Sequence, residues 1–139
     1  MVVLAQTDTT VGFLSQDSLQ LQKLKSRLPT KPFIIVYKNF DALNLRIPKQ
    51  KRALLRRSKK TSFIVKDTAF RVAQPTLNSQ ILRNNAWNYS TSANESQKSY
   101  EREFCESKAD IIIEDKNLLF EGQASTLLKI TNKKIRRLR

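Results

Sequence analysis

Short apolar runs with alternating or β-branched residues recur along the chain and predict a series of short strands. We predict eight strands, at residues 2–6, 33–37, 62–66, 69–73, 87–91, 110–114, 125–130 and 134–138. Helical spacing of apolar residues predicts four helices, at residues 17–28, 48–59, 76–84 and 99–108, the first behind a cap at Asp17 or Ser18. Because strands and helices alternate irregularly, we expect an α/β or α+β protein with a mixed sheet rather than a helical bundle.

The chain shows no sign of an internal boundary. It has two glycines, four prolines and no linker or repeat, so we predict a single domain over residues 1–139. Hydrophobic residues make up 40% of the chain, which is enough for one modest core. No apolar run approaches the roughly 18 residues of a membrane span, and the apolar N-terminus lacks the basic segment of a signal peptide. We therefore expect a cytoplasmic protein without a membrane partner.

The balance of charge points to an anionic partner. Twenty-six Lys and Arg against 12 Asp and Glu give a net charge of +14, which attracts nucleic acids, nucleotides or acidic surfaces. Residues 20–71 hold 15 basic and 2 acidic side chains, residues 93–121 hold 4 and 8, and residues 129–139 hold 6 and none. This pattern of basic, acidic and basic segments suggests that one face is reserved for an anion.

The densest basic segment spans residues 49–60. Seven of its twelve residues are basic: Lys49, Lys51, Arg52, Arg56, Arg57, Lys59 and Lys60. One interpretation is a solvated helix face, which is the commoner fate of such a run. The other is a surface for RNA phosphates, because the opposing acids are missing and few aromatic residues are present to stack on bases.

The composition excludes several chemistries. The chain has no histidine and one cysteine, Cys105. A Ser–His or Cys–His catalytic pair, a His-ligated metal, an internal disulfide and a cysteine-cluster zinc site are therefore all excluded. We predict no metal site.

Clusters of small polar residues follow the predicted strands. Residues 6–12 read Gln-Thr-Asp-Thr-Thr-Val-Gly, residues 91–97 read Thr-Ser-Ala-Asn-Glu-Ser-Gln, and residues 124–128 read Ala-Ser-Thr-Leu-Leu. Upstream of the second cluster, residues 25–33 read Lys-Ser-Arg-Leu-Pro-Thr-Lys-Pro-Phe. Hydroxyl groups at strand ends can bind phosphate or carboxylate oxygens. Taken singly, each cluster is equally explained as a strand end or a helix cap.

The order of these four blocks resembles the YrdC-type family, the L-threonylcarbamoyladenylate synthases. Family members carry Pro-Thr-(Asp/Glu)-Thr-x-Tyr-Gly, Lys-x-Arg-Pro, Thr-Ser-Ala-Asn-x-Ser-Gly and Pro-Ser-Thr motifs in the same order. The resemblance implies a YrdC-like twisted mixed sheet with helices packed around it and a positively charged concave surface. It also implies a nucleotidyltransferase that joins L-threonine, bicarbonate and ATP into threonylcarbamoyl-AMP and releases pyrophosphate. The product serves the N6-threonylcarbamoyladenosine modification of tRNA.

The same resemblance implies roles for individual residues. The expected ATP site is Lys25, Arg27, Ser62, Asn94 and Arg136. The expected threonine site is Thr9, Ser92 and Ser125, with Thr7, Lys31, Arg71 and Thr126 in support. Arg71 is equally explained as a surface charge on a strand. Mg²⁺ is expected to arrive with ATP, and the expected partners are tRNA or double-stranded RNA and the proteins that transfer the threonylcarbamoyl group.

Several positions depart from the family pattern. Gln6 replaces a proline, Val11 a tyrosine, Gln97 a glycine and Lys129 an aspartate. We expect a shortened and divergent member, without the helix that usually precedes the first strand. An alternative function is therefore a non-catalytic protein on the same fold that binds double-stranded RNA, tRNA or the ribosome.

Overall fold

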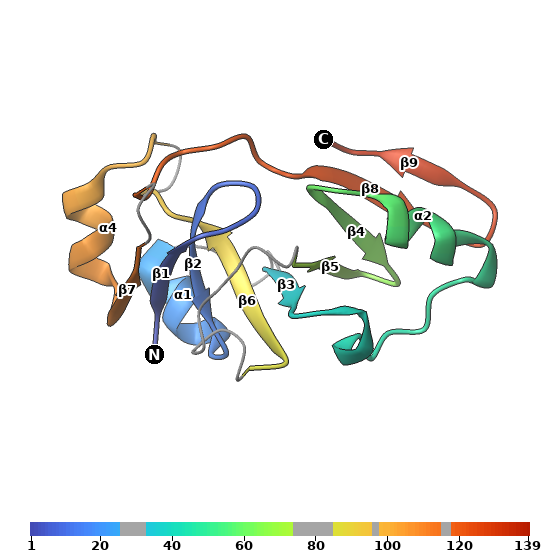
Figure 1. Ribbon diagram of the computed structural model, residues 1–139, viewed down its shortest axis with the longest axis horizontal. Helices are drawn as coiled ribbons and strands as arrows, with labels where there is room; N and C mark the ends of the chain where they lie inside the picture. The colour runs from blue at the N-terminus through green and yellow to red at the C-terminus, as the bar shows by residue number, and fades with distance from the viewer. Residues whose placement is uncertain (26–32, 74–84, 96–97, 115–117) are drawn as a thin grey trace.

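The computed structural model describes residues 1–25, 33–73, 85–95, 98–114 and 118–139. Within these residues, nine strands form one continuous sheet in the order β7-β1-β2-β6-β3-β5-β4-β8-β9 (Figure 1). The strands are β1 (Val3–Gln6), β2 (Val11–Ser15), β3 (Ile34–Tyr37), β4 (Thr61–Val65), β5 (Thr68–Val72), β6 (Trp87–Ser92), β7 (Ile111–Ile113), β8 (Thr126–Ile130) and β9 (Ile135–Arg137). Three pairs are parallel, β1 with β7, β3 with β5 and β4 with β8, and the other neighbours are antiparallel.

Helices accompany this sheet. The described α-helices are α1 (Ser18–Lys25), α2 (Arg52–Arg57) and α4 (Arg102–Lys108), and two short 3₁₀ turns are η1 (Phe40–Ala42) and η2 (Lys49–Lys51). The cap expected for the first helix is present, because the carboxylate of Asp17 accepts a hydrogen bond from the backbone N–H of Leu19 at 3.0 Å. The mixed α/β architecture predicted from the sequence is thus confirmed.

All eight predicted strands are present, with ends shifted by one or two residues. One strand was missed, β2, which is fully buried along its length. Gly12 lies inside β2, and glycine weakens the sequence signal of a strand. A side chain at this position would meet the carbonyl oxygen of Thr91 at 3.2 Å, so the interior position of β2 itself favours a residue without Cβ. The helix predicted at residues 76–84 lies outside the described residues.

Two main apolar clusters hold the helices to the sheet. The first joins β1 and β2 to α1 and α4 through side chains that include Leu4, Phe13, Leu21 and Cys105, all fully buried. The second joins β3, β4 and β5 to α2 through Tyr37, Leu55, Phe63, Val65 and Phe70 among others. A small third cluster of Val3, Ala5 and Leu14 lies against β7. Because β1 contributes to both the first and the third clusters, this strand is buried on both faces.

Residues 118–125 connect the two edges of the sheet. Figure 1 shows this segment running from the side of β7 across to β8, which lie near opposite ends of the strand order. On the way it meets the loop between β1 and β2, where the N–H of Gly122 donates to the hydroxyl of Thr10 at 2.9 Å. A Cβ at Gly122 would lie 2.1 Å from the carbonyl oxygen of Thr9, so only glycine fits this crossing. Among the described residues, no helix is long and apolar enough to cross a membrane.

Candidate functional site

The loop between β1 and β2 is organised by one hydroxyl group. Thr7 Oγ1 donates to the carbonyl oxygen of Thr10 at 2.6 Å and accepts the N–H groups of Thr9 and Thr10 at 3.2 and 3.3 Å. A threonine that bonds its own backbone two and three residues on is a common device for closing a tight turn. The result is that the hydroxyl of Thr9 is held at a defined place above the sheet.

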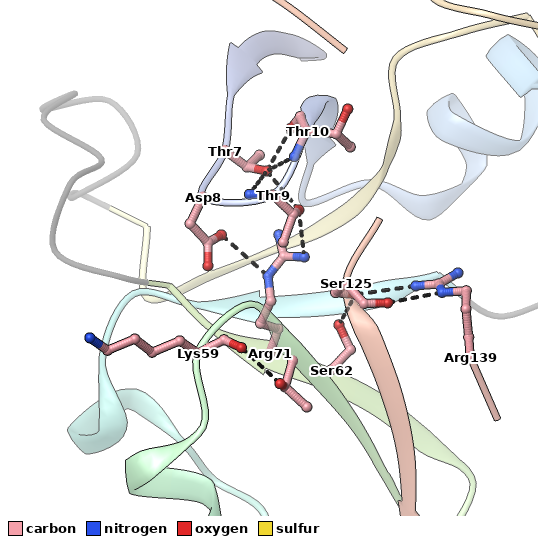
Figure 2. A network of polar contacts seen from close by, with 10 residues as sticks. Thr7, Asp8, Thr9, Thr10, Lys59, Ser62, Arg71, Ser125 and Arg139 are labelled. Atoms are coloured by element: carbon pink, nitrogen blue, oxygen red, sulfur yellow. Dashed lines mark hydrogen bonds and ion pairs between the residues drawn. The ribbon is translucent and has the colours of Figure 1, made fainter. Parts of the chain in front are cut away.

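Arg71 comes from β5 to meet this loop. Its Nη1 donates to Thr9 Oγ1 at 3.1 Å, and its Nε lies 3.5 Å from Oδ1 of Asp8 (Figure 2). The side chains of Arg71 and Asp8 are only 6% and 4% exposed. Among the described residues neither carboxylate oxygen of Asp8 has a hydrogen-bond partner, so the contact is an ion pair held by charge alone. Burial lowers the pKa of Arg71 and Asp8 opposes that shift.

A second polar group lies where β4 and β8 begin. The hydroxyls of Ser62 and Ser125 are 2.7 Å apart. Arg139 donates from Nε to the carbonyl oxygen of Ser125 at 3.0 Å and from Nη2 to its hydroxyl at 3.2 Å (Figure 2). The backbone of Arg139 is tied to Leu127 of β8, which holds its guanidinium at this place. The charge of Arg139 also contributes to lowering the pKa of Arg71, because the two guanidinium groups repel each other.

Lys25 holds the loop that follows β6 in place. Its Nζ donates to the carbonyl oxygens of Ser92 and Asn94 at 3.1 and 2.8 Å and to Oδ1 of Asn94. The hydroxyl of Ser92 also donates to Oδ1 of Asn94, at 3.0 Å. Lys25 is 7% exposed. A buried cation with these oxygen acceptors fixes the shape of the loop that follows β6.

Members of these groups line a cavity of about 180 Å³. Its wall combines the β1–β2 loop, Arg71, the end of β6, Ser125 and Arg139. Hydroxyl groups and two guanidinium groups line it, its described lining contains no acid, and the neighbouring Asp8 is already paired with Arg71. Such a site favours an anion, because carboxylate and phosphate oxygens accept from both kinds of donor.

The structure brings together part of the predicted site. Thr7, Thr9, Arg71, Ser92 and Ser125 line the cavity. Ser62 contacts it through Ser125, and Lys25 and Asn94 lie behind the loop of Ser92. Arg136 and Thr126 are on β9 and β8, outside the lining. Arg27 and Lys31 lie outside the described residues. The ligand roles of all these residues stay predictions.

Two contributors were missed. Asp8 lies inside the motif of residues 6–12, and an acidic residue at this turn was the signal that the sequence offered. Arg139 was overlooked in favour of Arg136, three residues earlier. The alternation of β9 places Arg136 opposite Lys129, whereas Arg139 lies beyond the end of the strand and turns to Ser125. Only the pairing of β8 with β9 decides between the two arginines.

The basic segment of residues 49–60 is distributed over η2, α2 and the turn before β4. Leu55 points into the second apolar cluster, and of the seven basic residues only Lys51 is half-buried while the others are exposed. Within the described part of the chain, none of the seven forms an ion pair. The exposed cationic face is therefore present, and its RNA partner stays a prediction.

Fold and cavity together define a mixed α/β protein with a small anion-receptive site near strand ends. No protein-family model and no curated protein matches the sequence. Solved structures do match. Sua5 of P. abyssi superposes with a TM-score of 0.80 at 19% identity, covering 99% of this chain and 52% of Sua5. The P. abyssi Sua5 complex with L-threonine gives 0.75 at 18%, covering 99% and 49%.

E. coli YciO gives a TM-score of 0.75 at 15% identity, covering 99% of this chain and 82% of YciO. The chain thus has the YrdC-like fold that Sua5 and YciO share, as the sequence motifs predicted. It spans about half the length of the Sua5 structures that it matches.

Proposed function

We propose that this protein binds L-threonine and ATP in and beside the described cavity and joins them with bicarbonate to form threonylcarbamoyl-AMP. The observation that carries the proposal is the convergence of Thr9, Arg71, Ser92, Ser125 and Arg139 on one cavity. It is supported by the fold, since a Sua5 neighbour is described as a complex with L-threonine. The cavity volume of about 180 Å³ is below the roughly 300–1,000 Å³ of pockets for larger ligands. It suits an amino acid, and the nucleotide extends outside it.

The reaction needs alignment and charge neutralisation more than a side-chain nucleophile. The amine of threonine attacks the carbon of bicarbonate, and water leaves to give the carbamate. A carbamate oxygen then attacks the α-phosphorus of ATP, and pyrophosphate leaves with the bonding electron pair. Arg71 and Thr9 hold the threonine carboxylate, while Arg139 and Ser125 face the phosphate. All four residues line the cavity, where Arg71 already donates to the hydroxyl of Thr9 and Arg139 to that of Ser125.

Mg²⁺ enters this scheme with its substrate. The described residues include no group of three or more acidic, histidine or cysteine side chains that could hold a metal. Asp8, the carboxylate that lies beside the described lining of the cavity, is paired with Arg71. Mg²⁺ carried by ATP keeps phosphate and water oxygens as ligands and needs no dedicated cage.

The direct test is pyrophosphate release by the purified chain. Release is expected only when ATP, L-threonine and bicarbonate are all present. Replacement of Thr9 by valine removes one donor at constant shape, and a hydrogen bond to a charged group contributes about 1.5–3 kcal/mol. Thr9→Val should therefore lower kcat/KM for threonine by roughly tenfold to a hundredfold. Thr68→Val, on β5 outside the cavity lining, is the matched control and should leave kcat/KM unchanged.

Absence of pyrophosphate release, even with the transfer proteins added, would contradict the enzyme function. The second candidate function, a non-catalytic RNA- or ribosome-binding protein, would then be preferred. It is favoured by the exposed cations of residues 49–60, which form no ion pair among the described residues. The fold also accommodates residues that depart from the family pattern. The side chain of Gln6 accepts the N–H of Phe120 at 2.9 Å, and Val11 is buried.

A further inference from the structure

A second cavity lies on the face of the sheet opposite the candidate site. It has a volume of about 310 Å³ and is bounded by α2, by the segment that runs from the end of β3 into η1, and by the adjoining ends of β4 and β5. Ser62 and Arg71 belong to the candidate site, whereas Phe63 and Val72, the next residues along β4 and β5, line this second cavity. Because neighbouring side chains of a strand point to opposite faces, the sheet separates the two cavities. We call the second cavity the α2 pocket.

Much of the wall of the α2 pocket is apolar. Leu55 and Phe63, each 4% exposed, line it together with the half-buried Val72 and Ala73. Phe40 of η1 also lines it and is 42% exposed, so a large part of this aromatic side chain contacts water. The apolar body of a ligand in the pocket would remove such surface from water, which favours binding.

Three cations from separate segments line the same pocket. Lys38 follows β3, Arg56 lies on α2 and Lys60 precedes β4. All three are exposed, none of them is in an ion pair with a residue that the structure describes, and the described lining contains no acidic side chain. Neighbouring cations repel one another, and a bound anion relieves that repulsion. The α2 pocket therefore combines an apolar wall with a local excess of positive charge.

The uncharged polar side chains of the lining already bond to the backbone. Ser58 and Thr61 donate their hydroxyl groups to backbone carbonyl oxygens at 2.7 and 2.8 Å, and Oδ1 of Asn39 accepts a backbone N–H at 2.9 Å. Recognition in this pocket therefore depends on charge and apolar surface more than on a pattern of hydrogen bonds. A sugar or a nucleobase would bury polar edges without partners here, and burial of an unpaired polar group costs free energy.

We propose that the α2 pocket binds a small amphipathic organic anion of the aromatic carboxylate class. The apolar body of this ligand packs on Phe40, Leu55 and Phe63, and its carboxylate lies at the cations. Arginine offers a carboxylate two parallel donors, and lysine adds a point charge. A volume of about 310 Å³ is at the lower end of the roughly 300–1,000 Å³ of small-molecule sites, which suits one or two rings. The proposal does not depend on the proposed function, because the two cavities lie on opposite faces.

The experiment titrates the full chain with anilinonaphthalene sulfonate, an aromatic anion whose fluorescence rises when it leaves water. The cation variant is Arg56→Gln with Lys60→Gln. The matched control is Arg57→Gln with Lys59→Gln, which removes the same charge at adjoining positions outside the lining. The cation variant should lose about tenfold or more in affinity, because hydrogen bonds from charged donors are lost. The control should change affinity by less than about twofold, as expected for exposed charges at a distance.

A second pair of variants tests the apolar wall at constant net charge. Ala73→Leu fills part of the pocket and should also lower the affinity for the dye by about tenfold or more. Ala53→Leu, at an exposed position of α2 outside the lining, is the matched control and should leave the affinity unchanged. If Ala73→Leu melts well below the wild type, Phe40→Ala takes its place, because Phe40 is an exposed member of the wall.

Competition against the bound dye tests the class of ligand. Naphthoate should displace the dye at a lower concentration than either the neutral naphthalene methanol or AMP. Equal losses in the cation variant and its control, or unchanged affinity in the wall variant, would overturn the proposal, because the dye would then bind by net charge or elsewhere. Stronger displacement by AMP than by naphthoate would also overturn it, since the pocket would then take a nucleotide. The titrations with dye alone contain no ATP, threonine or bicarbonate, so their outcome is independent of the proposed enzyme activity.

Discussion

Replacement of Asp8 by asparagine tests the most unusual contact of the site. Asn keeps the shape of Asp8 and removes its charge, so Arg71 is left as a buried cation without a counter-ion. At the observed 3.5 Å between Arg71 Nε and Asp8 Oδ1, two unit charges attract by about 5 kcal/mol at an effective dielectric constant of about 20. Breaking a buried pair by removing one partner typically costs about 3–5 kcal/mol. Asp8→Asn should therefore lower the free energy of unfolding by about 3–5 kcal/mol.

The assay is urea unfolding followed by circular dichroism, with the slope compared between variants. The matched control is Glu95→Gln, which removes the acid of the exposed Lys98–Glu95 pair and should produce no resolvable loss. A double variant, Asp8→Asn with Arg71→Met, should recover part of the loss because the unpaired buried cation is also gone. If Asp8→Asn loses less than about 1 kcal/mol, the pair is solvated in solution and our account of the cavity wall is wrong.

Three further predictions follow from single contacts. Gly122→Ala should displace the β1–β2 loop, because the new Cβ would meet the carbonyl oxygen of Thr9 at 2.1 Å. Amide hydrogen exchange in the loop should therefore accelerate. Unchanged exchange would show that Gly122 does not pack against this loop. Arg139→Ala should raise KM for ATP in the pyrophosphate assay, whereas Arg136→Ala should leave it unchanged. A rise in KM with Arg136→Ala alone would favour Arg136, the residue predicted from the sequence. Burial raises the pKa of Cys105 above its usual 9.0. The buried neutral thiol therefore contributes its full stabilisation below about pH 9, and this stabilisation should be lost as the pH rises through the raised pKa of Cys105. The measurement compares the free energy of unfolding of the wild type and of Cys105→Ala at alkaline pH.

Strand positions were largely predictable because the hydrophobic pattern of a strand is local. Eight of the nine described strands follow from runs of five or six residues whose side chains alternate or branch at Cβ. The exception, β2, contains Gly12, and its burial is decided by neighbours on both sides rather than by its own residues. Its selection as a central strand depends on the close approach of Thr91, which is a tertiary contact.

The candidate site was predictable in residue type but only partly in membership. Hydroxyl groups near strand ends indicated an anion site, and Thr9, Ser92 and Ser125 do line one cavity. Lys25 contacts the loop around Asn94, and its expected role at the nucleotide stays a prediction. The sequence also carries no local mark that distinguishes Arg139 from Arg136, because the choice depends on how β9 pairs with β8.

The sequence alone determined the succession of strands and helices, the excess of positive charge and the small polar residues after the strands. These properties reside in single residues and their near neighbours. The tertiary structure decided which of them meet: Arg71 with Asp8 and Thr9, and Ser62 with Ser125. Such meetings join residues more than sixty positions apart. They are set by strand order and register, which depend on the packing of the whole sheet.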